Sequence, residues 1–168
     1  KLRPLFLVLA LGLAALPAFA GAGALSLVPN DAVTVGVVKF SELRSSPLTA
    51  TLFEQTDKFG CNGDAGDFLR EAGLDPARDI DLLVVATSPR TTLGSDAEVL
   101  VVAEGRFNPA RLTRALTDRG AVLKTTAAGA YYTLPEKHSD SDHSGAVAFP
   151  SATMTIIGSE NAVAEALA

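Results

Sequence analysis

The segment from Ile80 to Ala103 constrains the fold of this chain most strongly. Ile80 to Ala86 is a nearly continuous apolar run, which is typical of a central strand covered on both faces. A second apolar run, Val99 to Ala103, follows after a polar connection that contains Pro89 and Gly94. A connection this short favours an antiparallel hairpin. The sequence therefore predicts an antiparallel sheet at the centre of the fold.

Hydrophobic spacing and cap residues predict the other elements. Strands are expected at 33–37, 122–126, 130–134, 146–149 and 154–157, and helices beginning at Pro47, Asp64 and Pro109 and after Ser159. Gly73 followed by Leu74 has the order of a glycine C-cap. This order of elements predicts an α+β fold, in which an antiparallel sheet carries helices on one face. Its core is expected to be ferredoxin-like (strand-helix-strand-strand-helix-strand) and extended by hairpins.

Residues 1–20 have the pattern of a cleavable secretory signal peptide. A basic start, Lys1-Leu2-Arg3, precedes the apolar run from Leu5 to Leu16, and Ala18-Phe19-Ala20 supplies the small residues of a cleavage site. The apolar run is shorter than the ~20 residues that a membrane-spanning helix needs. We therefore expect a periplasmic or secreted bacterial protein with no integral membrane segment after signal cleavage.

Residues 25–168 are long enough for a single α+β domain with its own hydrophobic core. The helical pattern from Ser159 to Ala168 lacks a residue that ends a helix, so we expect the domain to be truncated at this end. Cys61 is the only cysteine, so no intrachain disulfide can form. It is interpreted as an incidental thiol, with a reactive thiol or an intermolecular bridge as the alternatives.

The charge of the chain is acidic. The sequence has 14 Lys and Arg against 19 Asp and Glu, a net charge of −5, and signal cleavage would remove Lys1 and Arg3. Binding to a nucleic-acid backbone needs clustered basic residues. The composition therefore argues against a nucleic-acid partner, whereas an unknown protein partner stays open.

One loop has the residue types of a metal site. His138, Asp140, Asp142 and His143 place both histidines of the chain and two carboxylates within six positions. Imidazole and carboxylate suit zinc, copper or nickel. A calcium loop starting at Asp140 is disfavoured, because Ser151 stands where a bidentate Glu belongs. The alternative is a solvated hairpin loop that binds nothing, and no other cofactor is expected.

Catalytic motifs are missing from the sequence. It contains no G-x-S-x-G nucleophile elbow and no phosphate-binding glycine loop. The carboxylate pairs Asp79 with Asp81 and Glu98 with Glu104 are spaced to share a strand face. Such pairs could do acid–base chemistry, or they mark the solvated side of a strand. We expect no catalytic residues and no enzymatic activity.

The two tyrosines, Tyr131 and Tyr132, are adjacent in a predicted strand. Their side chains should therefore point to opposite faces, one into the core and one outward. The pair is interpreted as ordinary packing, with a small binding patch for a sugar or a peptide edge as the alternative.

Three segments resemble uncharacterised exported bacterial proteins of unknown function. They are Val28 to Val37 (V-P-x-D-A), Gly73 to Asp81 (G-L-D-P-x-x-D-I-D) and Gly105 to Pro109 (G-R-F-N-P). The resemblance implies an envelope or secreted domain that usually continues into a similar second half, and it supplies no catalytic residues.

Together these observations predict an exported non-catalytic domain that acts through protein contact or as part of an envelope protein. The alternative is a small-ligand or transition-metal binding protein that uses the 138–143 loop.

Overall fold

The structure is a computed structural model that describes residues 23–47, 49, 64–89, 97–135 and 145–168. Its two longest described strands, β2 (Ile80–Ser88) and β3 (Glu98–Gly105), are neighbours in the sheet. They pair antiparallel, with Val84 opposite Val102, and each of these two side chains is buried. The predicted antiparallel pair is therefore confirmed.

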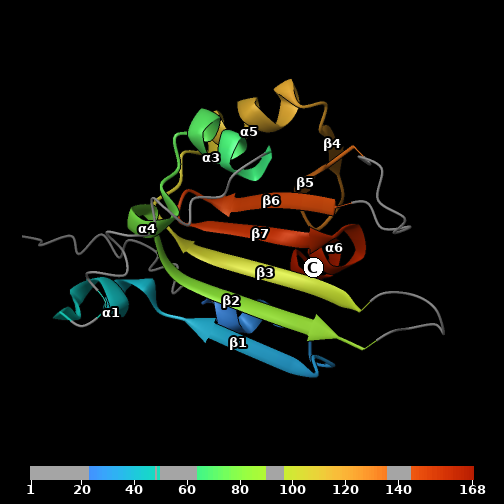
Figure 1. Cartoon of the computed structure of the whole chain (residues 1–168). Helices are drawn as coiled ribbons and strands as arrows, with labels where there is room; N and C mark the ends of the chain where they lie inside the picture. Colours follow the sequence, from blue (N-terminus) through green and yellow to red (C-terminus); the bar gives the residue numbers. More distant parts are fainter. Residues whose placement is uncertain (1–22, 48, 50–63, 90–96, 136–144) are drawn as a thin grey trace, which may run out of the picture.

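In the part of the chain that the structure describes, seven strands form one antiparallel sheet in the order β1-β2-β3-β7-β6-β5-β4 (Figure 1). The other strands are β1 (Thr34–Val38), β4 (Val122–Thr125), β5 (Ala130–Thr133), β6 (Gly145–Ser151) and β7 (Met154–Ser159). The α+β class is thus as expected.

The helical segments that the structure describes are short. They are η1 (Ala24–Leu27), α1 (Phe40–Ser45), α3 (Asp64–Ala72), α4 (Pro76–Asp79), α5 (Pro109–Asp118) and α6 (Glu160–Ala166). The glycine cap of α3 is confirmed, because Gly73 has φ +63° and the Leu74 amide donates to the Leu69 carbonyl. Most of the helix expected from Pro47 falls on residues outside the description, as do the predicted signal peptide 1–20 and Cys61.

Helices lie on both faces of the sheet, which corrects the expectation of one covered face. α6 and η1 pack through Val163 and Ala24 against Val84, Leu100 and Ile156, which form the main hydrophobic core. α3 and α5 cover the opposite face over β6, where Val147 and Phe149 alternate with the core residues Ala146 and Ala148 (Figure 1). The reason is that strands 80–88 and 98–105 carry apolar residues at successive positions, so both of their faces favour burial.

The ferredoxin-like order of strands is not confirmed. A split β-α-β unit would place another strand between its first two strands. Here β1 pairs directly with β2 in antiparallel orientation, with Val37 opposite Val84. In the described residues, no helix is long and apolar enough to cross a membrane.

Candidate functional site

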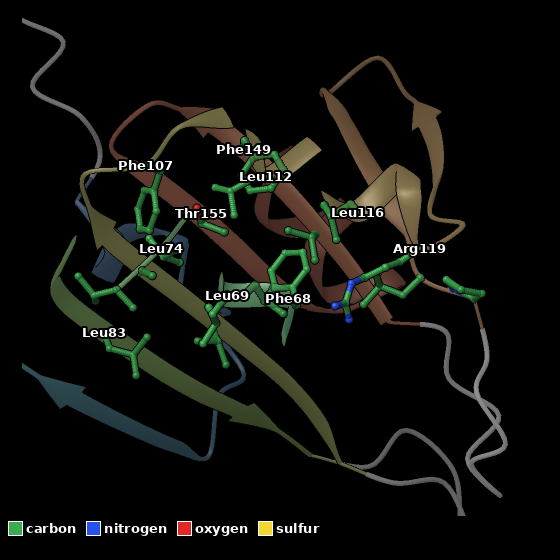
Figure 2. Close-up of a pocket in the computed structure, with 17 residues that line it drawn as sticks. Phe68, Leu69, Leu74, Leu83, Phe107, Leu112, Leu116, Arg119, Phe149 and Thr155 are labelled. Carbon is green, nitrogen blue, oxygen red and sulfur yellow. The ribbon is translucent and has the colours of Figure 1, made fainter. Parts of the chain in front are cut away.

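A pocket of about 430 Å³ lies between the sheet and the α3–α5 pair (Figure 2). Its floor is the face of β2, β3, β6 and β7 that carries Leu83, Val101, Val147 and Ile157. Aromatic and aliphatic side chains from the helices and loops form the other walls. These are Phe68, Leu69, Leu74, Phe107, Leu112 and Leu116, and Phe149 of β6 adds a further aromatic ring.

Local sequence signals hold the helical wall in place. The Asn108 side chain accepts a 3.1 Å hydrogen bond from the Arg111 amide, and Pro109 occupies the first turn of α5. The amphipathic spacing of α5 turns Leu112 and Leu116 inward, where both are buried. The pocket wall is therefore fixed by capping and by core packing.

One hydroxyl interrupts the apolar lining. Thr155 on β7 is only 6% exposed, and its Oγ1 has no hydrogen-bond partner among the residues that the structure describes. Its cross-strand neighbour is Ala103, which also lines the pocket. Figure 2 places Thr155 near Phe107 and Leu112, away from Arg119. A buried hydroxyl without a partner costs free energy, so this position is chemically distinctive.

An ion pair lies at the Arg119 end of the pocket. The Arg119 Nε and Nη2 atoms are each 3.0 Å from Glu71 Oε2, and the guanidinium lies 5.6 Å from the centroid of the Phe68 ring. The carboxylate balances the charge of the guanidinium. The described residues therefore make this end of the pocket polar, with one positive and one negative side chain in contact.

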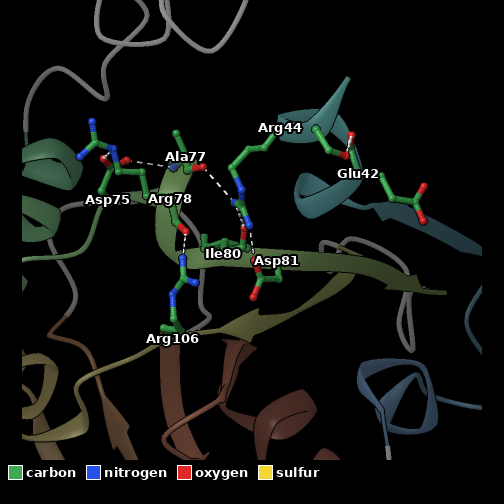
Figure 3. A network of polar contacts seen from close by, with 9 residues as sticks. Glu42, Arg44, Asp75, Ala77, Arg78, Ile80, Asp81 and Arg106 are labelled. Atoms are coloured by element: carbon green, nitrogen blue, oxygen red, sulfur yellow. Dashed lines mark hydrogen bonds and ion pairs between the residues drawn. The ribbon is translucent and has the colours of Figure 1, made fainter. Parts of the chain in front are cut away.

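Two polar clusters outside the pocket hold elements together. In the first, the Arg44 Nη1 donates to the carbonyls of Ala77 (2.9 Å) and Ile80 (2.6 Å), and its Nη2 pairs with Asp81, which ties α1 to the start of β2 (Figure 3). Asp79 ends α4 and accepts from the Asp75 amide. The carboxylates at 79 and 81 therefore have separate structural partners.

The second cluster joins β4, β5 and α6. The Glu160 carboxylate accepts from the Tyr131 hydroxyl at 3.0 Å and pairs with the Lys124 ammonium at 2.6 Å. The hydrogen bond to Glu160 raises the pKa of Tyr131 and is also the main cause of the raised pKa of Lys124.

The tyrosine pair points to opposite faces as predicted. Tyr131 is buried in the main core, whereas Tyr132 packs beside Phe149 on the pocket side, with ring centroids 6.3 Å apart. Glu104, one member of the second carboxylate pair, accepts from the Ala24 amide. These partners favour a packing role for both motifs.

The predicted metal residues His138, Asp140, Asp142 and His143 lie outside the described residues. Among the residues that are described, no three His, Cys, Asp or Glu side chains come together as metal ligands would. The pocket was not predicted from the sequence, because its described walls come from six separate helices and strands and from the loops between them. The only local signal was Thr155, a single hydroxyl inside an apolar strand.

Comparison of the chain with protein-family models, curated proteins and solved structures found no match.

Proposed function

We propose that this domain is a non-catalytic binding module that takes a neutral, apolar small molecule into the pocket between the sheet and the α3–α5 pair. The observation that carries the proposal is the pocket itself, whose walls are hydrocarbon apart from Thr155 and Arg119 in the described lining. Its volume of about 430 Å³ falls within the range of small-molecule sites, roughly 300–1,000 Å³.

The chemistry of the walls suits binding. Arg119 is paired with Glu71, so an anionic ligand would compete with a carboxylate that is already in place. An apolar ligand would gain roughly 0.8 kcal/mol for each methylene that it buries. Its affinity should therefore rise about fourfold for each added methylene until the pocket is full.

Fluorescence titration with the neutral probe N-phenyl-1-naphthylamine, followed by displacement with 1-alkanols of increasing length, tests the proposal. Val101→Phe fills the pocket from β3, and Val99→Phe is the matched control, because Val99 lies on the same face of the same strand outside the pocket lining. Ile157→Phe is a second filling variant. We expect at least tenfold weaker binding for both filling variants and unchanged binding for the control.

Two results would overturn the proposal. One is that the intact chain does not bind the probe. This result would count against the proposal even if residues of the chain itself fill the pocket. The other is equal binding by Val101→Phe and Val99→Phe.

We also propose that the domain works outside the cytoplasm, on the strength of the signal-peptide pattern in residues 1–20. Fractionation of cells expressing the chain with and without these residues tests export. Retention of both forms in the cytoplasm would contradict it.

A second candidate function is protein contact through the edge strand β1. All five of its residues are exposed, and the exposed valines include Val35 (45%) and Val37 (44%). Among the described strands β1 ends the sheet, and it contains no charge or proline, which are the usual devices against edge pairing. The opposite edge, β4, carries Lys124, so β1 is the edge better suited to pairing.

We propose a second copy of this chain as the partner of β1. Antiparallel self-pairing centred on Gly36 would place Val35 opposite Val37 of the other copy. The same register places Lys39 opposite Val33 of the second copy, so that Asp31 of that copy is its diagonal neighbour. This diagonal contact would bring opposite charges together at each end of the pair, in competition with the ion pair between Lys39 and Glu42 within each chain.

Sedimentation equilibrium of the intact chain tests this second function. We expect a reversible dimer that the double variants V35K/V37K and V35E/V37E each lose and that an equimolar mixture of the two restores. Val99→Lys, at an exposed site on β3, should leave the dimer unchanged. A wild-type chain that stays monomeric, or a mixture that does not associate, would contradict the self-pairing.

A further inference from the structure

We infer that the ligand of the pocket carries one hydrogen-bonding oxygen, an alcohol or a ketone, that forms a hydrogen bond with Thr155 Oγ1. This inference rests on the proposed function and narrows it from any apolar molecule to a neutral, singly oxygenated one. The observation behind it is a threonine that is only 6% exposed, lines the pocket and has an unpartnered hydroxyl in the described part of the chain.

The neighbours of Thr155 explain why the described residues do not supply the missing partner. Across the ladder Thr155 faces Ala103, and the side chains near it in the pocket are those of Phe107, Leu112 and Phe149. None of these side chains has a donor or an acceptor. The backbone groups of β7 are engaged with β3 and β6 in the sheet.

Water is a poor partner at this position. A buried water typically needs two to four polar contacts, and the described lining offers it Thr155 alone at this end of the pocket. A ligand oxygen is placed here by the burial of the rest of the molecule, so it does not need further polar contacts. The hydroxyl of Thr155 can donate to a ketone or an alcohol and can accept from an alcohol.

The ion pair at the other end limits the charge of the ligand. Arg119 is held by Glu71, with both guanidinium contacts at 3.0 Å, and no other pocket-lining residue that the structure describes is charged. A ligand with a net charge would therefore enter a hydrocarbon pocket without a counter-charge, at a high desolvation cost. The site therefore favours a neutral molecule that binds with its single polar atom pointing toward Thr155.

A comparison of octane, 1-octanol and 2-octanone as competitors of N-phenyl-1-naphthylamine tests the inference. Wild type, Thr155→Val and Thr155→Ser are compared, because valine keeps the shape and removes the hydroxyl, and serine keeps the hydroxyl. We expect the preference of wild type for the two oxygenated compounds over octane to fall roughly tenfold in Thr155→Val. Thr155→Ser should keep the preference, and octane should bind Thr155→Val at least as tightly as wild type.

The outcomes separate this inference from the proposed function. If all three compounds bind but the preference is the same in wild type and Thr155→Val, the proposed hydrogen bond to Thr155 is wrong. The proposal that the pocket binds an apolar molecule is then still supported. If none of them displaces the probe from wild type, the proposed function fails and this inference fails with it. A loss of preference in both Thr155→Val and Thr155→Ser would also overturn the inference, because the hydroxyl would not be its cause.

Discussion

The Tyr131 hydroxyl donates a 3.0 Å hydrogen bond to the Glu160 carboxylate and so joins β5 to the first turn of α6. The same carboxylate binds the Lys124 ammonium on the edge strand β4. Both partners are stabilised in their protonated forms, so the pKa of each is raised in the folded protein. This cluster predicts how the stability of the domain depends on pH.

Glu160→Gln should weaken the loss of stability at alkaline pH. A group whose pKa is raised on folding contributes its full stabilisation below its unfolded pKa and loses it as the pH rises through the folded value. For Tyr131 and Lys124 this loss begins above about pH 10. Urea unfolding from pH 7 to 11.5 should give a steep decline for wild type and a shallower one for Glu160→Gln.

The control for this prediction removes the same charge from the same helix. Glu165→Gln, at an exposed position of α6, should keep the steep alkaline decline of wild type. Equal slopes for wild type and Glu160→Gln would show that the cluster does not couple proton binding to folding.

Thr155→Val should stabilise the protein in the absence of ligand. The substitution keeps the β-branched shape and removes a buried hydroxyl that has no partner in the described structure, which costs about 1–3 kcal/mol. The free energy of unfolding, measured in guanidinium chloride, should rise by an amount of this order. Thr34→Val, at an exposed position of β1, should change it by less than about 0.5 kcal/mol. Destabilisation by Thr155→Val would mean that the hydroxyl has a partner in the folded chain.

Gly105→Ala should destabilise the end of the β2–β3 pair. A Cβ at residue 105 would lie 2.0 Å from the Asp79 carbonyl oxygen, which also accepts from the Arg106 amide at 2.8 Å. Because backbone must move to make room, we expect a loss of about 1–3 kcal/mol in chemical denaturation. Gly36→Ala is the matched control, since its Cβ would meet only the Val85 carbonyl at 3.9 Å. The prediction fails if the two alanines have equal effects.

Asn108→Ala should lower stability by about 0.5–2 kcal/mol, because the Arg111 amide at the start of α5 loses its side-chain acceptor. Asn108→Ser keeps a capping oxygen and should retain most of the stability. Thermal unfolding followed by circular dichroism measures both variants. An alanine variant as stable as wild type would show that the cap contributes nothing.

The helices and strands followed largely from local sequence. The β2–β3 pair, the cap of α3 at Gly73, the start of α5 at Asn108-Pro109 and the start of α6 at Ser159 were all predicted at or near their observed positions. Each of these features depends on a few neighbouring residues, either on their alternation in a strand or on one cap side chain. The acidic charge can be read directly from the composition. The opposite orientation of Tyr131 and Tyr132 follows from their adjacent positions in one strand.

The order of the strands and the pocket depended on contacts between distant residues. The sequence favoured a ferredoxin-like order with one covered face, but β1 pairs with β2, and α3 and α5 cover the face opposite to α6. The sequence of a strand that is apolar on both faces does not determine which helix covers which face. Thr155 looks in the sequence like an ordinary strand residue, and only the packing of Ala103, Phe107 and Leu112 around it leaves its hydroxyl buried without a partner in the described structure. Local spacing thus determined the elements, whereas the chemistry of the pocket arose when side chains far apart in the chain came together and excluded water.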